Sequence, residues 1–183
     1  RGGAGADNLE GNAGQDTLNY SGSSAGVSVD LATGAVSGGD ATGDTISGFE
    51  RVWGGKFADI ILGNVWNNQL FGNGGDDTII GGDGKDNIRG GVGADSLDGG
   101  DGIDTLNYAG SLAGVTVNLA TGSVSGGDAS GDTISAFENV TGSDSGDNLT
   151  GDGVANLLLG NGGNDTLSGG GGKDILTGGT GAD

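Results

Sequence analysis

The chain has 183 residues, of which 47 are glycine and only 32% are hydrophobic, too few apolar side chains for an ordinary layered core. Its 25 acidic and 6 basic residues give a formal net charge of −19, and the scattered basic residues argue against nucleic acid or membrane insertion. Because Cys and His are absent, disulfides, thiolate sites and the commonest transition-metal ligand are excluded. The composition favours a hard cation held by oxygen atoms, calcium rather than magnesium.

A nine-residue repeat, Gly-Gly-x-Gly-x-Asp-x-apolar-x, begins at residue 2. Faultless copies occupy 2–10, 81–89, 90–98, 99–107 and 169–177. The windows 11–19, 72–80 and 160–168 differ only by Asn at the second position, whereas 54–62, 63–71, 142–150 and 151–159 are more degenerate. Repetition at a fixed period predicts a solenoid, because one such unit cannot bury a core without its neighbours.

A second period of 88 residues divides the chain into two units. The sequence DTLNY at 16–20 returns at 104–108, and Phe49-Glu50 returns as Phe137-Glu138. In chain order we expect nonapeptides over 1–19, a spacer over 20–53, six nonapeptides over 54–107, a second spacer over 108–141 and nonapeptides over 142–183. These segments are expected to form one continuous solenoid and to be an excerpt of a longer chain.

Each nonapeptide combines a turn with a short strand. The three glycines of its first six residues tolerate positive φ, so this half predicts a tight turn with exposed backbone carbonyls. The last three residues, such as 78–80, predict a strand with one apolar side chain pointing inward from the eighth position. The expected fold is therefore all-β, with a narrow aliphatic stack as its core.

The aspartates at the sixth position form the candidate metal site. If two nonapeptides make one coil, these carboxylates fall into two files with a spacing of roughly 4.7 to 4.9 Å between coils, where they would repel unless a cation lay between them. Calcium prefers six to eight oxygen ligands, which carboxylates and turn carbonyls together can supply. The residues at this position are Asp7, Asp16, Asp59, Asp77, Asp86, Asp95, Asp104, Asp147, Asp165, Asp174 and Asp183.

The nonapeptide resembles the RTX (repeats-in-toxin), or hemolysin-type, calcium-binding repeat. The resemblance implies a right-handed parallel β-roll, several Ca²⁺ ions in the turns, export by a type I system, and folding on meeting extracellular calcium. It also implies that turn carbonyls join the aspartates as ligands. The glycines marked in this way are Gly72, Gly74, Gly81, Gly82, Gly84, Gly90, Gly91, Gly93, Gly99, Gly100 and Gly102. Where Asn68 and Asn156 replace the aspartate, a weak or absent site is expected.

The spacers over 20–53 and 108–141 are similar to the blocks between nonapeptide runs of adenylate-cyclase-type toxins. Alternating residues such as 27–31 predict strands, and we expect the spacers to form wider coils that continue the roll. Their aspartates (Asp40, Asp44, Asp128 and Asp132) are expected to be exposed loop carboxylates, with extra calcium sites as the alternative.

The function that these patterns predict is a calcium-binding, secreted structural module, extracellular or on the cell surface, that folds when Ca²⁺ binds. The alternative is an adhesin or matrix module of the same fold that binds a polysaccharide or neighbouring copies of itself. An enzyme is not expected, because there is no His or Cys and the aspartates recur evenly instead of converging at one place. A disordered acidic linker fits the composition, although not the fixed spacing, and describes the expected metal-free state.

Overall fold

Each three-residue strand has an apolar residue at its centre, which is less exposed than its two neighbours. The computed structural model describes residues 1–183 and contains two 3-10 helices, η1 (Gly39–Ala41) and η2 (Gly127–Ala129), but no α-helix. Its strands are β1 (Asn8–Glu10), β2 (Thr17–Asn19), β3 (Ser28–Asp30), β4 (Ala35–Ser37), β5 (Thr45–Ser47), β6 (Arg51–Trp53), β7 (Ile60–Asn64), β8 (Gln69–Gly74), β9 (Thr78–Gly84), β10 (Asn87–Val92), β11 (Ser96–Gly102), β12 (Thr105–Asn107), β13 (Thr116–Asn118), β14 (Ser123–Ser125), β15 (Thr133–Ser135), β16 (Asn139–Thr141), β17 (Asn148–Thr150), β18 (Leu157–Gly162), β19 (Thr166–Ser168) and β20 (Ile175–Thr180).

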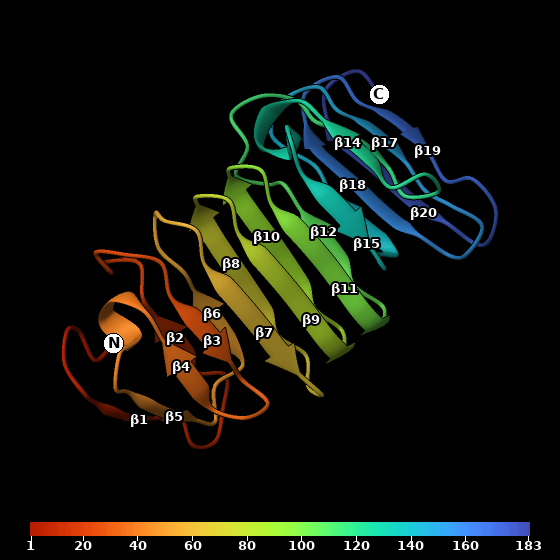
Figure 1. Ribbon diagram of the computed structural model, residues 1–183. Coiled ribbons are helices and arrows are strands. Elements are labelled where there is room, and N and C mark those ends of the chain that lie inside the picture. The colour runs from red at the N-terminus through yellow and green to blue at the C-terminus, as the bar shows by residue number, and fades with distance from the viewer.

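Outside the spacers, successive strands alternate between two faces of an elongated stack of coils (Figure 1). One face is a continuous sheet in the order β2-β6-β8-β10-β12-β16-β18-β20. The other consists of three sheets, β1-β5, then β15-β11-β9-β7-β3-β4, and β14-β13-β17-β19. Ile88 pairs with Leu70 on one side and Leu106 on the other, so one coil is two nonapeptides long. All pairs are parallel except the hairpins β3-β4 and β13-β14, which confirms the predicted parallel β-roll.

The spacers widen the coil without interrupting the eight-stranded sheet. Leu18 pairs with Val52, which lies 34 residues later. On the other face β5 pairs back with β1 and β3 pairs forward with β7, and the second spacer repeats this arrangement with β15 and β13. That face is therefore divided at each spacer, between β4 and β5 and between β14 and β15.

The core is a single column of 21 buried hydrophobic residues. Each regular nonapeptide contributes the one side chain at its eighth position, such as Ile79, Ile88 or Leu97. The spacers add larger groups, among them Tyr20 and Tyr108, each of which is only 2% exposed. Stability must therefore come from stacking between coils, since no single nonapeptide encloses a core.

Strands in the central run are longer than the three residues expected from the pattern. β9 and β11 each span seven residues and continue through the first glycines of the next turn. Gly82 pairs with Gly100 and Gly84 with Gly102, so the turns themselves stack in register. Regular 18-residue spacing allows this, because consecutive turns on one edge have the same conformation.

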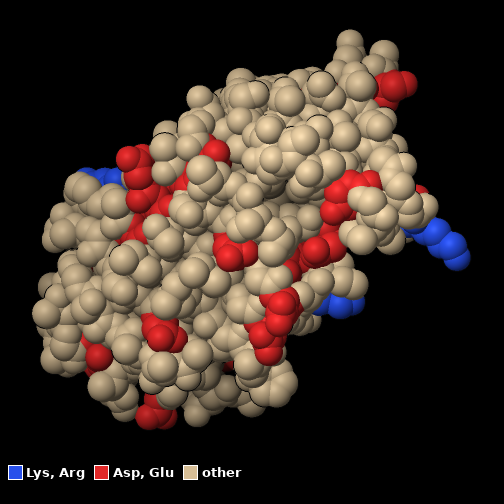
Figure 2. Space-filling model, turned by 45° about the vertical axis from the view of Figure 1, so that its right-hand side comes forward, with Lys and Arg blue, Asp and Glu red and all other residues tan.

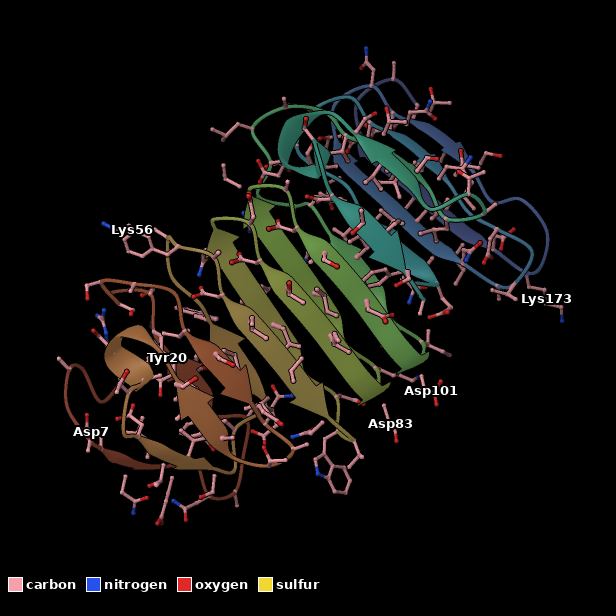
Figure 3. The ribbon with its side chains drawn as sticks, in the orientation of Figure 1. Asp7, Tyr20, Lys56, Asp83, Asp101 and Lys173 are labelled. Atoms are coloured by element: carbon pink, nitrogen blue, oxygen red, sulfur yellow. The ribbon has the colours of Figure 1, made fainter.

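Acidic side chains are exposed in several patches over the visible face, with few basic ones among them (Figure 2). Asp83 and Asp101 project outward from neighbouring turns, whereas Lys56 and Lys173 lie toward opposite ends of the stack (Figure 3). Such a surface favours cations in general. The structure contains no helix long and apolar enough to cross a membrane.

Candidate metal sites in the stacked turns

The sixth-position aspartates lie at the beginning of the strands, in two files on opposite edges of the stack. Asp59, Asp77 and Asp95 directly precede β7, β9 and β11, whereas Asp86 and Asp104 directly precede β10 and β12. All five are at most 2% exposed. The coil length of two nonapeptides thus produces the predicted files.

From Asp59 onward, one carboxylate oxygen of each aspartate joins its coil to the preceding one. The backbone N–H of Asp77 donates to Asp95 Oδ1 at 2.9 Å, and that of Asp59 donates to Asp77 Oδ1 at 2.7 Å. In the other file the N–H of Asp86 donates to Asp104 Oδ1 at 2.7 Å. These links satisfy backbone donors that would otherwise be buried without partners.

The second carboxylate oxygen is buried and has no hydrogen-bond partner at seven of these positions. The seven are Asp7, Asp16, Asp77, Asp86, Asp95, Asp104 and Asp165. A buried oxygen of a carboxylate that lacks any partner is costly, and buried charges in proteins are normally paired or bound to metal. The orphaned Oδ2 atoms therefore mark places where a cation fits.

Burial and like charge act together on these carboxyl groups. Burial, reinforced by the neighbouring charges of Asp95 and Asp59, raises the pKa of Asp77 to about 8. Burial likewise raises the pKa values of Asp86 and Asp95 to about 6, with further contributions from Asp104 and Asp132 respectively. A divalent cation would reverse these shifts, because it stabilises the ionised form.

Backbone carbonyls must complete any such site. No group of three or more Asp or Glu side chains converges on one point. A Cβ atom added to Gly72 would touch Asp77 Oδ2 and lie 2.7 Å from the carbonyl oxygen of Gly90. A Cβ atom added to Gly81 would touch both Asp86 Oδ2 and the carbonyl oxygen of Gly99. Carboxylate and carbonyl oxygens thus approach each other around a glycine, and this donor set suits Ca²⁺.

The predicted glycine ligands lie in the stacked turns. Gly82, Gly84, Gly91, Gly93, Gly100 and Gly102 have positive φ angles, between 94° and 155°. Gly72, Gly81, Gly90 and Gly99 begin their turns beside the aspartates, and Gly74 lies farther along the turn that Gly72 begins. Their role as ligands remains a prediction.

We expect Gly81→Ala to destabilise the calcium-loaded protein by about 1 to 3 kcal/mol, because its methyl group would collide with Asp86 Oδ2 and the Gly99 carbonyl. Gly153→Ala is the matched control, since nothing lies within 4 Å of its added Cβ and its φ is not positive. Urea unfolding of both variants in excess calcium measures the difference. Equal destabilisation would contradict the proposed crowding at the first turn position.

Two aspartates in degenerate repeats have no orphaned oxygen, because donors in their own turns form hydrogen bonds to the second carboxylate oxygen. The N–H of Gly55 donates to Asp59 Oδ2 at 2.6 Å. Ser143 donates its N–H to Asp147 Oδ2 at 2.7 Å and its hydroxyl to Asp147 Oδ1 at 2.9 Å.

The two asparagines that replace the aspartate use their amide groups within the stack. Asn156 Nδ2 donates to the Glu138 carbonyl oxygen at 2.7 Å, and Asn68 makes the corresponding contact with Glu50. Of the remaining predicted positions, Asp174 is half-buried and Asp183 is exposed.

Two spacer aspartates are buried, so the expectation that they are exposed loop carboxylates is wrong. Asp44 is 7% and Asp132 is 9% exposed. They accept the backbone N–H groups of Asp7 and Asp95, each at 2.9 Å, and so occupy the places of sixth-position aspartates. Asp40 and Asp128 are half-buried.

Two spacer glutamates also extend a file, although they lie outside the nonapeptide motif. Glu50 Oε2 accepts the N–H of Asp16 at 3.0 Å, and Glu138 Oε2 accepts that of Asp104 at 2.8 Å. Their repetition at the 88-residue period was the available signal. Their residue type and the wider coil concealed the equivalence.

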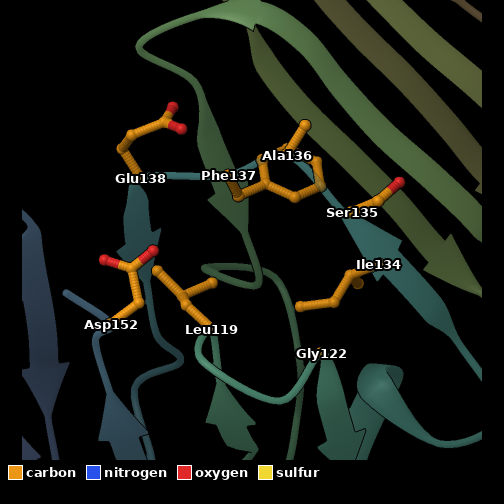
Figure 4. Close-up of a pocket in the computed structure, with 8 residues that line it drawn as sticks. All are labelled: Leu119, Gly122, Ile134, Ser135, Ala136, Phe137, Glu138 and Asp152. Carbon is orange, nitrogen blue, oxygen red and sulfur yellow. The ribbon is translucent and has the colours of Figure 1, made fainter. Parts of the chain in front are cut away.

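A cavity of about 120 Å³ opens beside the second spacer, where the divided face leaves β14 and β15 unpaired with each other. Figure 4 shows Leu119, Ile134 and Phe137 around it, with the carboxylates of Glu138 and Asp152 on one side. Two carboxylates without a third ligand do not define a metal site, so the candidate sites remain those of the files.

A family model described as the RTX calcium-binding nonapeptide repeat (4 copies) matches residues 1–22, 71–106 and 150–183, about half of the chain. No curated protein matches it. All seven orphaned carboxylate oxygens lie within the matched ranges. Asp44, Asp59, Asp132 and Asp147, whose oxygens have partners, lie outside them. The repeats bind calcium, at multiple sites.

Proposed function

Because the chain belongs to the family of RTX calcium-binding nonapeptide repeats, we propose that it is an extracellular structural module whose folding is driven by Ca²⁺ between the stacked turns. The observation that carries this proposal is the set of seven buried carboxylate oxygens without hydrogen-bond partners. Repeats of this family form a structural calcium-binding module, and we assign this segment no catalytic role.

The mechanism couples charge neutralisation to stacking. Without metal, the aspartates of neighbouring coils bring like charges together around a core that gains one side chain per nonapeptide. With Ca²⁺, the Oδ2 of Asp77 and the nearby carbonyl of Gly90 become ligands, along with other turn carbonyls. Any ligand that binds only the folded state stabilises it, so each occupied site favours the stacking of the next coil.

The proposed location follows from this coupling. A chain whose calcium-binding turns stay unfolded at low calcium and fold at high calcium suits export before its fold is complete, for which a type I system is proposed. The net charge of −19 opposes complete folding of the metal-free chain. We propose that this segment serves a longer secreted or cell-surface protein as a calcium-stabilised part.

A calcium titration of a metal-stripped sample, followed by far-UV circular dichroism, tests the proposal. We expect a cooperative gain of β-structure with Ca²⁺ and little change with Mg²⁺ at equal concentration, because Mg²⁺ demands a stricter octahedral geometry. Full β-structure before calcium is added would overturn metal-driven folding.

A second candidate function is binding of a polysaccharide by the outer face of the eight-stranded sheet. Trp53, which is 41% exposed, pairs in register with Phe71, and their ring centroids are 6.4 Å apart. Arg89 follows Phe71 in the same register. An exposed indole ring packed on a half-buried phenyl ring, with a guanidinium group in the same register, favours sugar rings. Retention of the calcium-loaded protein on an immobilised polysaccharide would support this function.

A further inference from the structure

The carboxylates of the two files fall into two classes, which differ in whether they have partners without metal. In the run of nonapeptides over 72–107, all four sixth-position aspartates have an orphaned Oδ2. In the spacers and the two degenerate nonapeptides after each spacer, no carboxylate oxygen is both buried and orphaned. The second class therefore needs no cation to offset burial.

In the spacers, tyrosine hydroxyls bind the carboxylate oxygen whose counterpart in the run is orphaned. Tyr20 donates its hydroxyl hydrogen to Asp44 Oδ2 at 2.8 Å, and Tyr108 donates to Asp132 Oδ2 at the same distance. Oδ1 of each aspartate already accepts a backbone N–H from the preceding coil. In the complete stack both oxygens of these carboxylates thus have partners, and the tyrosine bond is the one made within each spacer.

The two segments without buried, orphaned carboxylate oxygens also contain more buried core residues and fewer acidic residues than the run over 72–107. Residues 20–71 and 108–159 each contribute eight of the buried core residues, whereas 72–107 contributes four. The run over 72–107 has eight acidic residues in 36 positions, against five in the 52 positions of 20–71 and six in 108–159. Burial favours folding of the spacer segments, and charge repulsion opposes folding of the run.

We propose that residues 20–71 and 108–159 form blocks that fold without metal. Each block is stabilised by a hydrogen bond, Tyr20–Asp44 or Tyr108–Asp132, and the run that requires calcium connects the two blocks. This inference deepens the proposed function, on which it rests. Calcium then completes the stack by ordering the run between two blocks that are already folded. The tyrosines act as fixed substitutes for calcium at the coils where the repeat is interrupted.

Hydrogen exchange of the full chain, resolved by peptide, tests the blocks. In the metal-stripped protein we expect amide protection in 20–71 and 108–159 to exceed that in 72–107 by about tenfold or more. Adding calcium is expected to protect 72–107 as well. The double variant Tyr20→Phe, Tyr108→Phe removes only the two hydroxyls and should speed metal-free exchange in the blocks about ten- to a hundredfold, because it orphans two buried carboxylate oxygens.

Asp101→Asn is the control, since it removes a charge from an exposed carboxylate of the run and should leave metal-free exchange in the blocks unchanged. Exchange that is equally fast in all segments without calcium would overturn the blocks while leaving calcium-driven folding intact. Slow exchange in all segments without calcium would overturn both. Unchanged exchange in the tyrosine double variant would show that the hydroxyls do not close the blocks.

Discussion

Asp86→Asn is expected to raise the calcium concentration at the folding midpoint about tenfold or more. Asp86 is 2% exposed, its Oδ1 accepts the N–H of Asn68, and its Oδ2 is orphaned toward the proposed cation. Asparagine preserves the acceptor at Oδ1 but removes the charge, and interactions with a charged group contribute about 1.5 to 3 kcal/mol. A calcium titration followed by circular dichroism measures the shift.

Asp83→Asn provides the matched control, because it removes the same charge from an exposed carboxylate three residues earlier in the same turn. We expect it to shift the calcium midpoint only slightly, since exposed charges are screened by water and salt. Figure 3 shows Asp83 projecting away from the stack. Equal shifts for the two variants would mean that the calcium midpoint depends on net charge alone and not on the buried aspartates of the file.

The second large effect is expected from pH in the absence of metal. Folding raises the pKa of Asp77 to about 8 and those of Asp86 and Asp95 to about 6, from an ordinary value near 3.8. Groups whose pKa is higher in the folded state stabilise it fully below the unfolded pKa, and this contribution is lost as the pH rises through the folded values. Metal-stripped protein should therefore gain β-structure as the pH falls from 8 to 5.

Circular dichroism of metal-stripped protein between pH 8 and pH 5 measures this gain, with light scattering to detect association near the isoelectric point of about 4.1. In saturating calcium the same scan should be nearly flat above pH 6, because the cation already neutralises the files. A metal-free signal that is constant, or that increases toward pH 8, would contradict the sign derived from the aspartate pKa values.

Protonation and calcium are thus expected to be alternative ways of removing the same repulsion. Both act on Oδ2 atoms that the fold buries without partners. The spacer aspartates differ, because the tyrosine hydroxyl already donates a hydrogen bond to their second oxygen. Comparison of the pH and calcium responses by segment would therefore report on the same division of the chain as hydrogen exchange.

The period, the inward apolar position and the two aspartate files follow from the amino-acid sequence, because each of these depends on residue type at a fixed spacing. The nonapeptide requires glycine where a turn has positive φ and aspartate where a strand begins, so the spacing predicts the positions of Asp77 and Asp95. The carbonyl sets could be named only by resemblance.

Which carboxylates lack hydrogen-bond partners depends on contacts that the spacing does not reveal. Asp44 and Asp132 lie in loops of irregular sequence, and their burial against Tyr20 and Tyr108 depends on contacts between residues 24 positions apart in a widened coil. Glu50 and Glu138 enter the file for the same reason, since the 34-residue coil returns them beside Asp16 and Asp104. Spacing in the chain determines position along a regular coil, whereas the partner of a buried oxygen depends on how the irregular coils pack.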